Sequence, residues 1–92
     1  MTANIEIDCP SSEERILPGH YAFRLSSTQA LVETEISVDR GPWQSCRHSC
    51  GFWWYDWHAR EGDHQVAARG TTRDGEAVNS HFRRFFVATR AR

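Results

Sequence analysis

The feature that most constrains the fold is an alternation of apolar and polar residues with a period of two. It is clearest over residues 31–39, where Val32, Thr34, Ile36 and Val38 alternate with charged or polar residues. Successive side chains of an extended strand point to opposite faces, so this period predicts a strand with one buried and one solvated face. Further segments of the same kind, or rich in strand-forming residues, are 5–8, 21–25, 43–47, 52–58, 64–69 and 78–88.

Turn-forming residues separate these segments at intervals of about 8 to 12 residues. Proline, glycine, serine and aspartate gather at residues 10–12, 18–19, 39–42, 62–63 and 73–75. About seven short strands without helical periodicity predict an all-β protein, an immunoglobulin-like sandwich of two sheets. The last segment is apolar on both faces, which we interpret as a bulge at Arg83 and Arg84.

Composition indicates one compact domain covering residues 1–92. Aliphatic residues are sparse, but 4 Trp, 5 Phe and 2 Tyr take their place, and each aromatic side chain buries roughly 150–250 Å². No run approaches the ~18 apolar residues of a membrane span. With a net charge of −1, the chain has no overall electrostatic attraction to nucleic acid or to an anionic membrane. We therefore expect neither of these partners.

The three cysteines, Cys9, Cys46 and Cys50, are an odd number. The first residues have neither the basic nor the apolar region of a secretory signal. We therefore expect three reduced thiols and a cytoplasmic location. In an exported chain, one disulfide bridge and one free thiol would be expected.

Four segments, in this order, resemble one family of domains. They are ISVDRGPWQ at 36–44, the alternating aromatic residues Trp53, Tyr55 and Trp57, GDHQVAAR at 62–69, and the turn at 73–75. Together they are similar to bacterial immunoglobulin-like domains such as the dimerisation domain of sulfite-oxidase-type molybdenum enzymes. The resemblance covers about residues 21–88.

This resemblance implies an immunoglobulin-like fold and a non-catalytic domain that packs against a partner subunit or a neighbouring domain. Two departures limit what it implies. Arg40 stands where the family's turn has its first glycine, and the 92 residues include no molybdopterin-binding domain. We therefore carry over the fold and not the molybdenum connection, and we expect no cofactor.

The aromatic block at 52–58 contains the main candidate binding residue. If Trp53, Tyr55 and Trp57 face the core, then Trp54 and Asp56 share the opposite face, which the carboxylate marks as solvated. Trp43, just after a turn, is expected to reach the same edge as Trp54.

Three alternatives remain for Trp54. In the first, Trp54 anchors a protein interface, where Trp, Tyr and Arg are enriched. In the second, Trp54 stacks on a sugar ring while Asp56, His58 or Arg60 forms hydrogen bonds with the sugar hydroxyl groups. Otherwise it is covered by the loop at 46–51.

Cys46, His48 and Cys50 form a weak candidate metal site. They supply at most three ligands, whereas a structural zinc ion takes four. Their C-x₃-C spacing is also looser than a C-x₂-C knuckle, so no metal is expected. The sequence also contains no nucleophile elbow and no phosphate-binding glycine-rich loop, so these thiols belong to no recognisable catalytic motif.

These observations predict a non-enzymatic module that binds protein, most simply a second copy of itself. The expected surface is an aromatic patch around Trp54 and Trp43 with arginine residues at its rim. Pairing of exposed edge strands is a second route. The alternative from another functional class is a carbohydrate-binding module that uses Trp54 and its polar neighbours.

Overall fold

The computed structural model describes residues 4–89, which form ten β-strands and no helix. The described part contains no helix suited to crossing a membrane. The molecule is elongated, with extents of 44 × 23 × 21 Å. The strands are β1 (Ile5–Cys9), β2 (Arg15–Ile16), β3 (Gly19–Ser27), β4 (Leu31–Val38), β5 (Gln44–Ser45), β6 (Arg47–Ser49), β7 (Phe52–Ala59), β8 (Gly62–Thr72), β9 (Ala77–Asn79) and β10 (Arg83–Val87).

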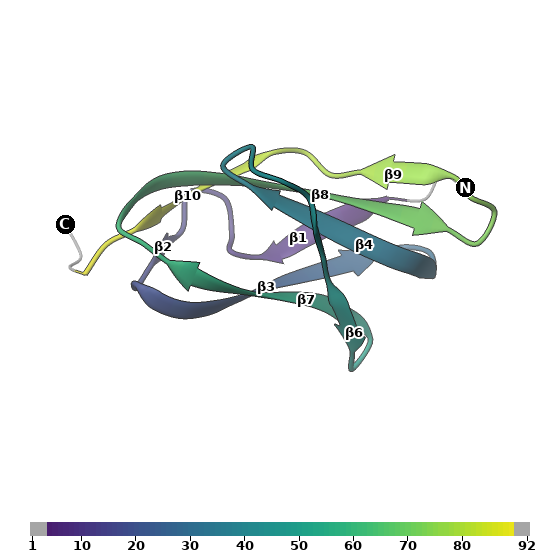
Figure 1. Ribbon diagram of the computed structural model, residues 1–92, viewed down its shortest axis with the longest axis horizontal. Helices are drawn as coiled ribbons and strands as arrows, with labels where there is room; N and C mark the ends of the chain where they lie inside the picture. Colours follow the sequence, from purple (N-terminus) through teal and green to yellow (C-terminus); the bar gives the residue numbers. More distant parts are fainter. Residues whose placement is uncertain (1–3, 90–92) are drawn as a thin grey trace.

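Two sheets pack face to face, as Figure 1 shows. Sheet A has the order β1-β3-β7-β6. Sheet B has the order β2-β10-β8-β4-β5, and β9 pairs with β8 beyond this path. Strands β3 and β7 pair antiparallel over seven positions, from Gly19 with Ala59 to Leu25 with Trp53. The predicted all-β sandwich is therefore confirmed.

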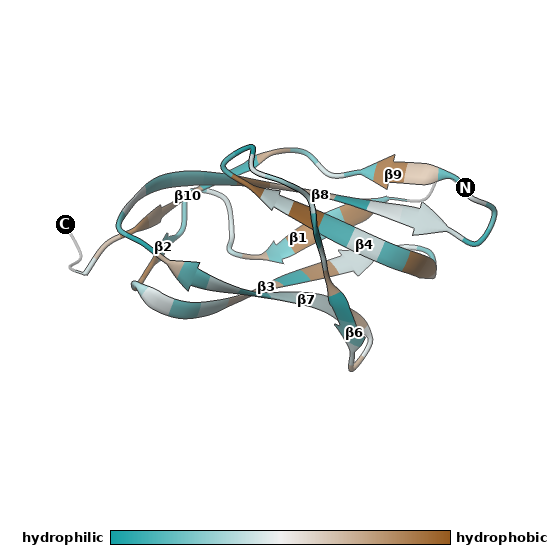
Figure 2. Ribbon diagram, viewed as in Figure 1, coloured by the Kyte–Doolittle hydropathy of each residue, from teal (hydrophilic) through white to brown (hydrophobic). Residues whose placement is uncertain are grey.

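The predicted inward faces form the core. Phe23 and Leu25 of β3, Ile36 of β4 and Val66 of β8 are fully buried. Trp53, Tyr55 and Trp57 of β7 pack against this cluster, as the alternation predicts. The brown positions of Figure 2 alternate with polar ones along strands such as β4.

Phe23 lies at the centre of the aromatic packing. Its ring centroid is 5.4 Å from those of Tyr21 and Trp57, 5.8 Å from that of Phe85 and 6.4 Å from that of Tyr55. Such offset and edge-to-face pairs add to the free energy gained by burial. Aromatic rings from both sheets thus replace the missing aliphatic side chains.

Two predicted strands are each divided in the structure. Residues 43–47 do not form one returning strand, because β5 pairs with β4 in sheet B and β6 pairs with β7 in sheet A. Cys46 is the residue at which the chain crosses between the sheets. The single strand predicted at 78–88 is β9 followed by β10, and residues 80–82 leave the ladder between them.

Two local expectations are wrong because the irregularities lie elsewhere. The register of β10 with β8 is continuous through Arg83 and Arg84, so no bulge is present there. A register shift between Leu31 and Glu33 instead lies at Val32. Val32 is therefore exposed and does not share the buried face of Ile36.

Candidate binding groove on the outer face of sheet B

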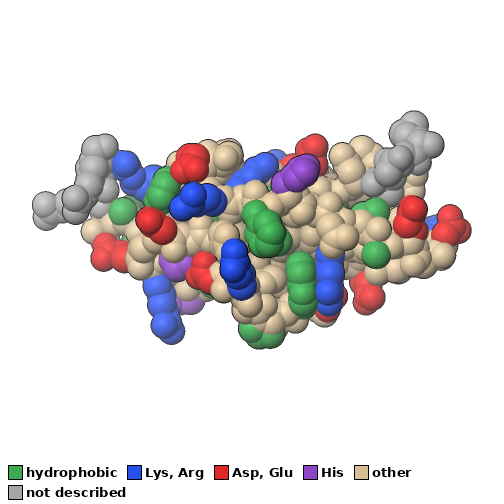
Figure 3. Space-filling view, turned by 90° about the horizontal axis from the view of Figure 1, so that it is seen from above, with side chains coloured by type: hydrophobic (Ala, Val, Ile, Leu, Met, Phe, Trp, Pro, Cys, Tyr) green, Lys and Arg blue, Asp and Glu red, His purple; other side chains and the backbone are tan. Residues whose placement is uncertain are grey.

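A groove of about 350 Å³ crosses the outer face of sheet B. Its floor is made of small side chains, because Ser37 of β4 pairs with Ala67 of β8 there. Its walls are Trp43 and Phe82, from the segments that follow β4 and β9. Figure 3 looks onto this face and shows hydrophobic side chains among basic ones near its middle.

Trp43 is held in place by its neighbours on sheet B. The Arg69 guanidinium lies 4.1 Å from the centroid of the Trp43 ring, a cation–π contact. The Arg69 Nε–H also donates a hydrogen bond of 2.8 Å to Glu35 Oε1. One face of the indole is thus covered, and Trp43 as a whole remains 36% exposed. An aromatic side chain fixed in this way loses little conformational entropy on binding a ligand.

Phe82 forms the opposite wall and is 65% exposed. Ser80 anchors its segment, because the Ser80 N–H donates to the Ala68 carbonyl at 2.8 Å and Ser80 Oγ accepts from the Ala68 N–H at 2.8 Å. The Ser80 hydroxyl donates to the His81 carbonyl at 3.0 Å. The segment is therefore tied to β8, while the Phe82 ring projects from it.

Arg40 lies at the rim, in a turn that favours glycine. Asp39 and Arg40 have positive φ angles of 54° and 60°, and the Gly41 N–H donates to the Val38 carbonyl at 2.9 Å. Positive φ at both central residues is typical of a type I′ turn, in which glycine commonly occupies the position of Arg40. Within residues 4–89, Arg40 forms no ion pair.

Hydrogen bonds between Asp39 and strand β8 hold the turn that contains Arg40 in place. Asp39 Oδ1 accepts from the Gln65 N–H at 3.0 Å, and Asp39 Oδ2 lies 2.6 Å from His64 Nδ1. His64 Nε2 lies 2.7 Å from the carbonyl oxygen of Arg60. Both ring nitrogens thus lie within hydrogen-bonding distance of an oxygen atom, which fixes the orientation of the ring.

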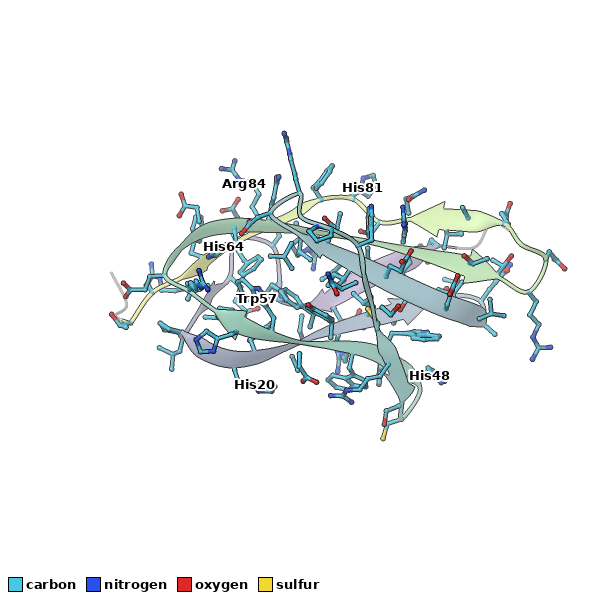
Figure 4. The ribbon with its side chains drawn as sticks, viewed as in Figure 1. His20, His48, Trp57, His64, His81 and Arg84 are labelled. Carbon is cyan, nitrogen blue, oxygen red and sulfur yellow. The ribbon has the colours of Figure 1, made fainter. Side chains whose placement is uncertain are left out.

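The His64 ring itself is packed between aromatic side chains. It stacks on Phe85 at 5.6 Å and meets Trp57 edge-on at 5.1 Å. Figure 4 shows His64 and Trp57 between the sheets, with His81 and Arg84 on the outer side of sheet B. The rim of the groove therefore rests on the core.

The sequence-predicted site around Trp54 lies on the outer face of sheet A. Trp54 is half-buried, and its indole N–H donates to the Ser49 carbonyl at 2.9 Å. The Phe52 ring lies 6.1 Å from it, and the Arg24 guanidinium lies 4.5 Å above Phe52. The segment before β7 thus covers part of Trp54, in keeping with the covered alternative.

Asp56 is exposed on this same face, as predicted. Arg47 Nη2 lies 3.3 Å from Asp56 Oδ2, and His20 Nε2 lies 2.9 Å from Asp56 Oδ1. These hydrogen bonds lower the pKa of the Asp56 carboxyl below its ordinary value, and the hydrogen bond from Arg47 has the largest effect. His58 pairs with His20 across β3 and β7, and Arg60 lies in the turn after β7.

Trp43 and Trp54 do not form one patch, so that expectation is wrong. Trp43 borders the groove on sheet B, whereas Trp54 projects from sheet A, on the other side of the sandwich. The crossing at Cys46 separates them. Sequence periodicity indicates faces within one strand but not the sheet to which the strand belongs.

The weak metal candidates also lie apart. His48 packs on the Trp53 ring at 4.7 Å, Cys50 is exposed at the tip of the β6–β7 hairpin, and Cys46 is partly buried. Burial raises the pKa of the Cys46 thiol above its ordinary value. Residues 4–89 contain no group of three or more potential metal ligands.

Sequence reasoning singled out Trp43 and noted Arg40, but it missed Phe82. The prediction of one continuous strand at 78–88 includes Phe82 as an ordinary strand residue. The signal available was its position among polar and basic residues, in Asn79-Ser80-His81-Phe82-Arg83. An isolated phenylalanine in such a segment marks a side chain with no core to enter.

No protein-family model and no curated protein matches the chain. Among solved structures, it is similar to fibronectin(III)-like modules of Clostridium thermocellum CbhA, with a TM-score of 0.73 at 18% identity over 96% of this chain and 99% of that one. CopC from Methylosinus trichosporium OB3b matches with a TM-score of 0.73 at 16% identity, covering 94% and 93% of the two chains.

A modular endo-β-1,4-mannanase from Cellulomonas fimi gives a TM-score of 0.75 at 16% identity over 95% of this chain. This chain spans 19% of the mannanase, and 20% of an engineered protein that it also matches. These similarities support the immunoglobulin-like sandwich. They provide no link to the dimerisation domain of molybdenum enzymes.

Proposed function

We propose that this chain is a non-catalytic protein-interaction module and that the groove between Trp43 and Phe82 is its recognition surface. The observation that carries the proposal is that two exposed aromatic side chains, Trp43 and Phe82, line one groove together with small residues. Hot spots of protein interfaces are enriched in Trp, Tyr and Arg, and the groove contains Trp43 and Arg40. Trp43 is already fixed by Arg69, which favours tight binding.

The chemistry of the groove favours a binding role over catalysis. No cysteine, histidine or carboxylate lines it, so its two serine hydroxyls have no base beside them. Nucleophilic catalysis by serine depends on such a base. Binding is the role that this set of side chains supports.

The groove also favours a peptide over a neutral sugar. Sugar recognition uses many hydrogen bonds to hydroxyl groups. The Ser37 hydroxyl, however, already donates a hydrogen bond to the Gly41 carbonyl, and the Ser80 hydroxyl both donates and accepts one within the protein. Of the other side chains that line the groove, only Arg40 and Asn79 are polar. A carbohydrate ligand is nevertheless the alternative, given the similarity to a domain of a modular mannanase.

Self-association, which the sequence suggests, is the less favoured form of this proposal. Strands at the sheet edges are short, with two residues in β2 and β5 and three in β6. The longer edge strand β1 has a register shift after Ile7, whose carbonyl accepts a hydrogen bond from Arg83. Short and irregular edges pair poorly with a second chain.

Selection of ligands from a displayed library of random twelve-residue peptides tests the proposal. Enriched peptides are synthesised, and their dissociation constants are measured by fluorescence anisotropy. We expect Phe82→Ala to weaken binding at least about tenfold, because it removes one wall. Leu17→Ala, the matched control at another exposed apolar residue, should leave the affinity unchanged.

Two results would overturn the proposal. One is that no peptide is enriched, or that the enriched peptides bind Phe82→Ala as well as the wild type. The other is a saturable change in tryptophan fluorescence with a soluble oligosaccharide, abolished by Phe82→Ala, which would establish the carbohydrate alternative.

A further inference from the structure

We infer that the groove takes an acidic peptide segment and that Arg40 is the residue that selects it. This inference rests on the proposed function and adds the chemistry of the ligand. The segment presents an apolar side chain between Trp43 and Phe82 and a carboxylate to the Arg40 guanidinium. Three independent observations support the role of Arg40.

The first observation is the backbone conformation of Arg40. Its φ of 60° is one that residues with a Cβ adopt at an energetic cost, and glycine adopts it freely. Asp39, also at positive φ, gains two hydrogen bonds from its carboxylate in this conformation. The Arg40 side chain gains no ion pair within residues 4–89. An uncompensated outlier of this kind is typical of residues kept for function.

The second observation is that Arg40 forms no ion pair within residues 4–89, a property that it shares with Arg60, Arg73 and Arg84 but not with several other arginine residues. Arg24 contacts Asp8, Arg47 contacts Asp56, and Arg69 contacts Glu35. Arg83 donates to the carbonyl groups of Ile7 and Pro10. The charge of Arg40 is therefore available to a ligand.

The third observation is the charge around the groove. Its lining contains one charged residue, Arg40, and no carboxylate. The carboxylate of the adjacent Asp39 is held by His64 and by the Gln65 N–H. Arg84, which is in register with Gln65, lies outside the groove and lines a neighbouring hollow together with Asp39 and Asp63, so Arg40 alone sets the charge of the groove. Complementarity therefore calls for an anionic ligand, and a guanidinium binds a carboxylate through two parallel hydrogen bonds.

The test compares each enriched peptide with a twin in which Asp and Glu are replaced by Asn and Gln. We expect enriched sequences to place an acidic residue near an aromatic or aliphatic one, and the twin to bind at least about tenfold more weakly. Arg40→Gln should abolish this difference. Arg73→Gln, in the turn before β9, is the matched control and should preserve it.

Arg40→Gly supplies a readout that a purely structural role would not produce. Glycine relieves the strain of the turn, so we expect the melting temperature to rise by about 5 °C. Binding of the acidic peptide should weaken in the same variant. A structural arginine would instead lose stability on replacement.

The outcomes separate this inference from the proposed function. If the peptides depend on Phe82 but show no acidic preference and bind Arg40→Gln normally, the inference is wrong and the proposed function stands. If no peptide binds through the groove, both fail. Saturable binding of polygalacturonate that requires Arg40, with no peptide enriched, would overturn the peptide and assign the anionic site to a sugar.

Discussion

At the scale of single residues, a phenylalanine has different roles between the two sheets and on the outer face of sheet B. Phe23 is fully buried among aromatic rings, whereas Phe82 stands exposed beside the groove. The first contributes to the free energy of folding, and the second is available to a ligand. Their difference follows from the segments that carry them, since Phe23 lies in a central strand and Phe82 outside the ladder.

Truncation of Phe23 should therefore lower the free energy of unfolding strongly, whereas truncation of Phe82 should leave it almost unchanged. Phe23→Ala should lower the free energy of unfolding by about 3–5 kcal/mol, because it leaves a cavity among four rings. Phe82→Ala should change it by less than about 0.5 kcal/mol. Urea denaturation followed by tryptophan fluorescence measures both. Equal losses in the two variants would contradict the assignment of Phe82 to the surface.

At the scale of elements, alternation predicts which residues form strands and which face of each strand is buried. It correctly places Phe23, Ile36 and Trp57 toward the core. It does not predict to which sheet a short segment belongs, because that depends on contacts far apart in the sequence. The divided segments at 43–47 and 78–88 are of this kind, and the position of Phe82 follows from the second.

The candidate site was less predictable for the same reason. Trp43 could be singled out by size and position, but its partners Arg69 and Phe82 come from other elements. Arg40 could be noted as a departure from a glycine, although only the backbone shows that its φ is positive. A groove between elements has no signature within any single strand.

The pairing of β3, β7 and β6 should influence how Asp56 titrates. Because Arg47 and His20 lower its pKa in the folded state, the carboxyl stabilises the fold above its unfolded pKa, and this contribution is lost as pH falls through the folded value. The side chains are exposed, so the effect on stability is small.

Carboxyl chemical shifts recorded by NMR across an acid titration measure this pKa directly. We expect the midpoint of Asp56 to lie below the ordinary value of 3.8 and to rise in Arg47→Gln. Arg73→Gln provides the control for removing a distant positive charge. An Asp56 midpoint unchanged by Arg47→Gln would show that the ion pair does not persist in solution.

At the scale of the whole molecule, the sandwich offers two faces of different character. The outer face of sheet B carries the groove, while the outer face of sheet A carries the paired cluster of Asp56, His20 and Arg47. The core lies between them, so a change on one face leaves the other intact. The short edge strands add little surface for pairing.

We therefore expect a monomer in light scattering over a dilution series with reductant present. The short edges and the irregular β1 are the physical reason. A dimer that persists at micromolar concentration and dissociates in Phe82→Asp would show instead that a second copy occupies the groove. A dimer unaffected by this variant would place the contact elsewhere and would revive edge pairing.

The β6–β7 hairpin, which follows the crossing between the sheets, also gives the molecule a point of attachment. Cys50, the exposed thiol among Cys9, Cys46 and Cys50, lies at the tip of the β6–β7 hairpin. Figure 1 shows this hairpin below the sandwich, on the side opposite β8 and β9. A maleimide linker on this sulfur would anchor the domain to a sensor surface by sheet A. Molecules attached through Cys50 would then present Trp43, Phe82 and Arg40 on the side facing away from the sensor surface.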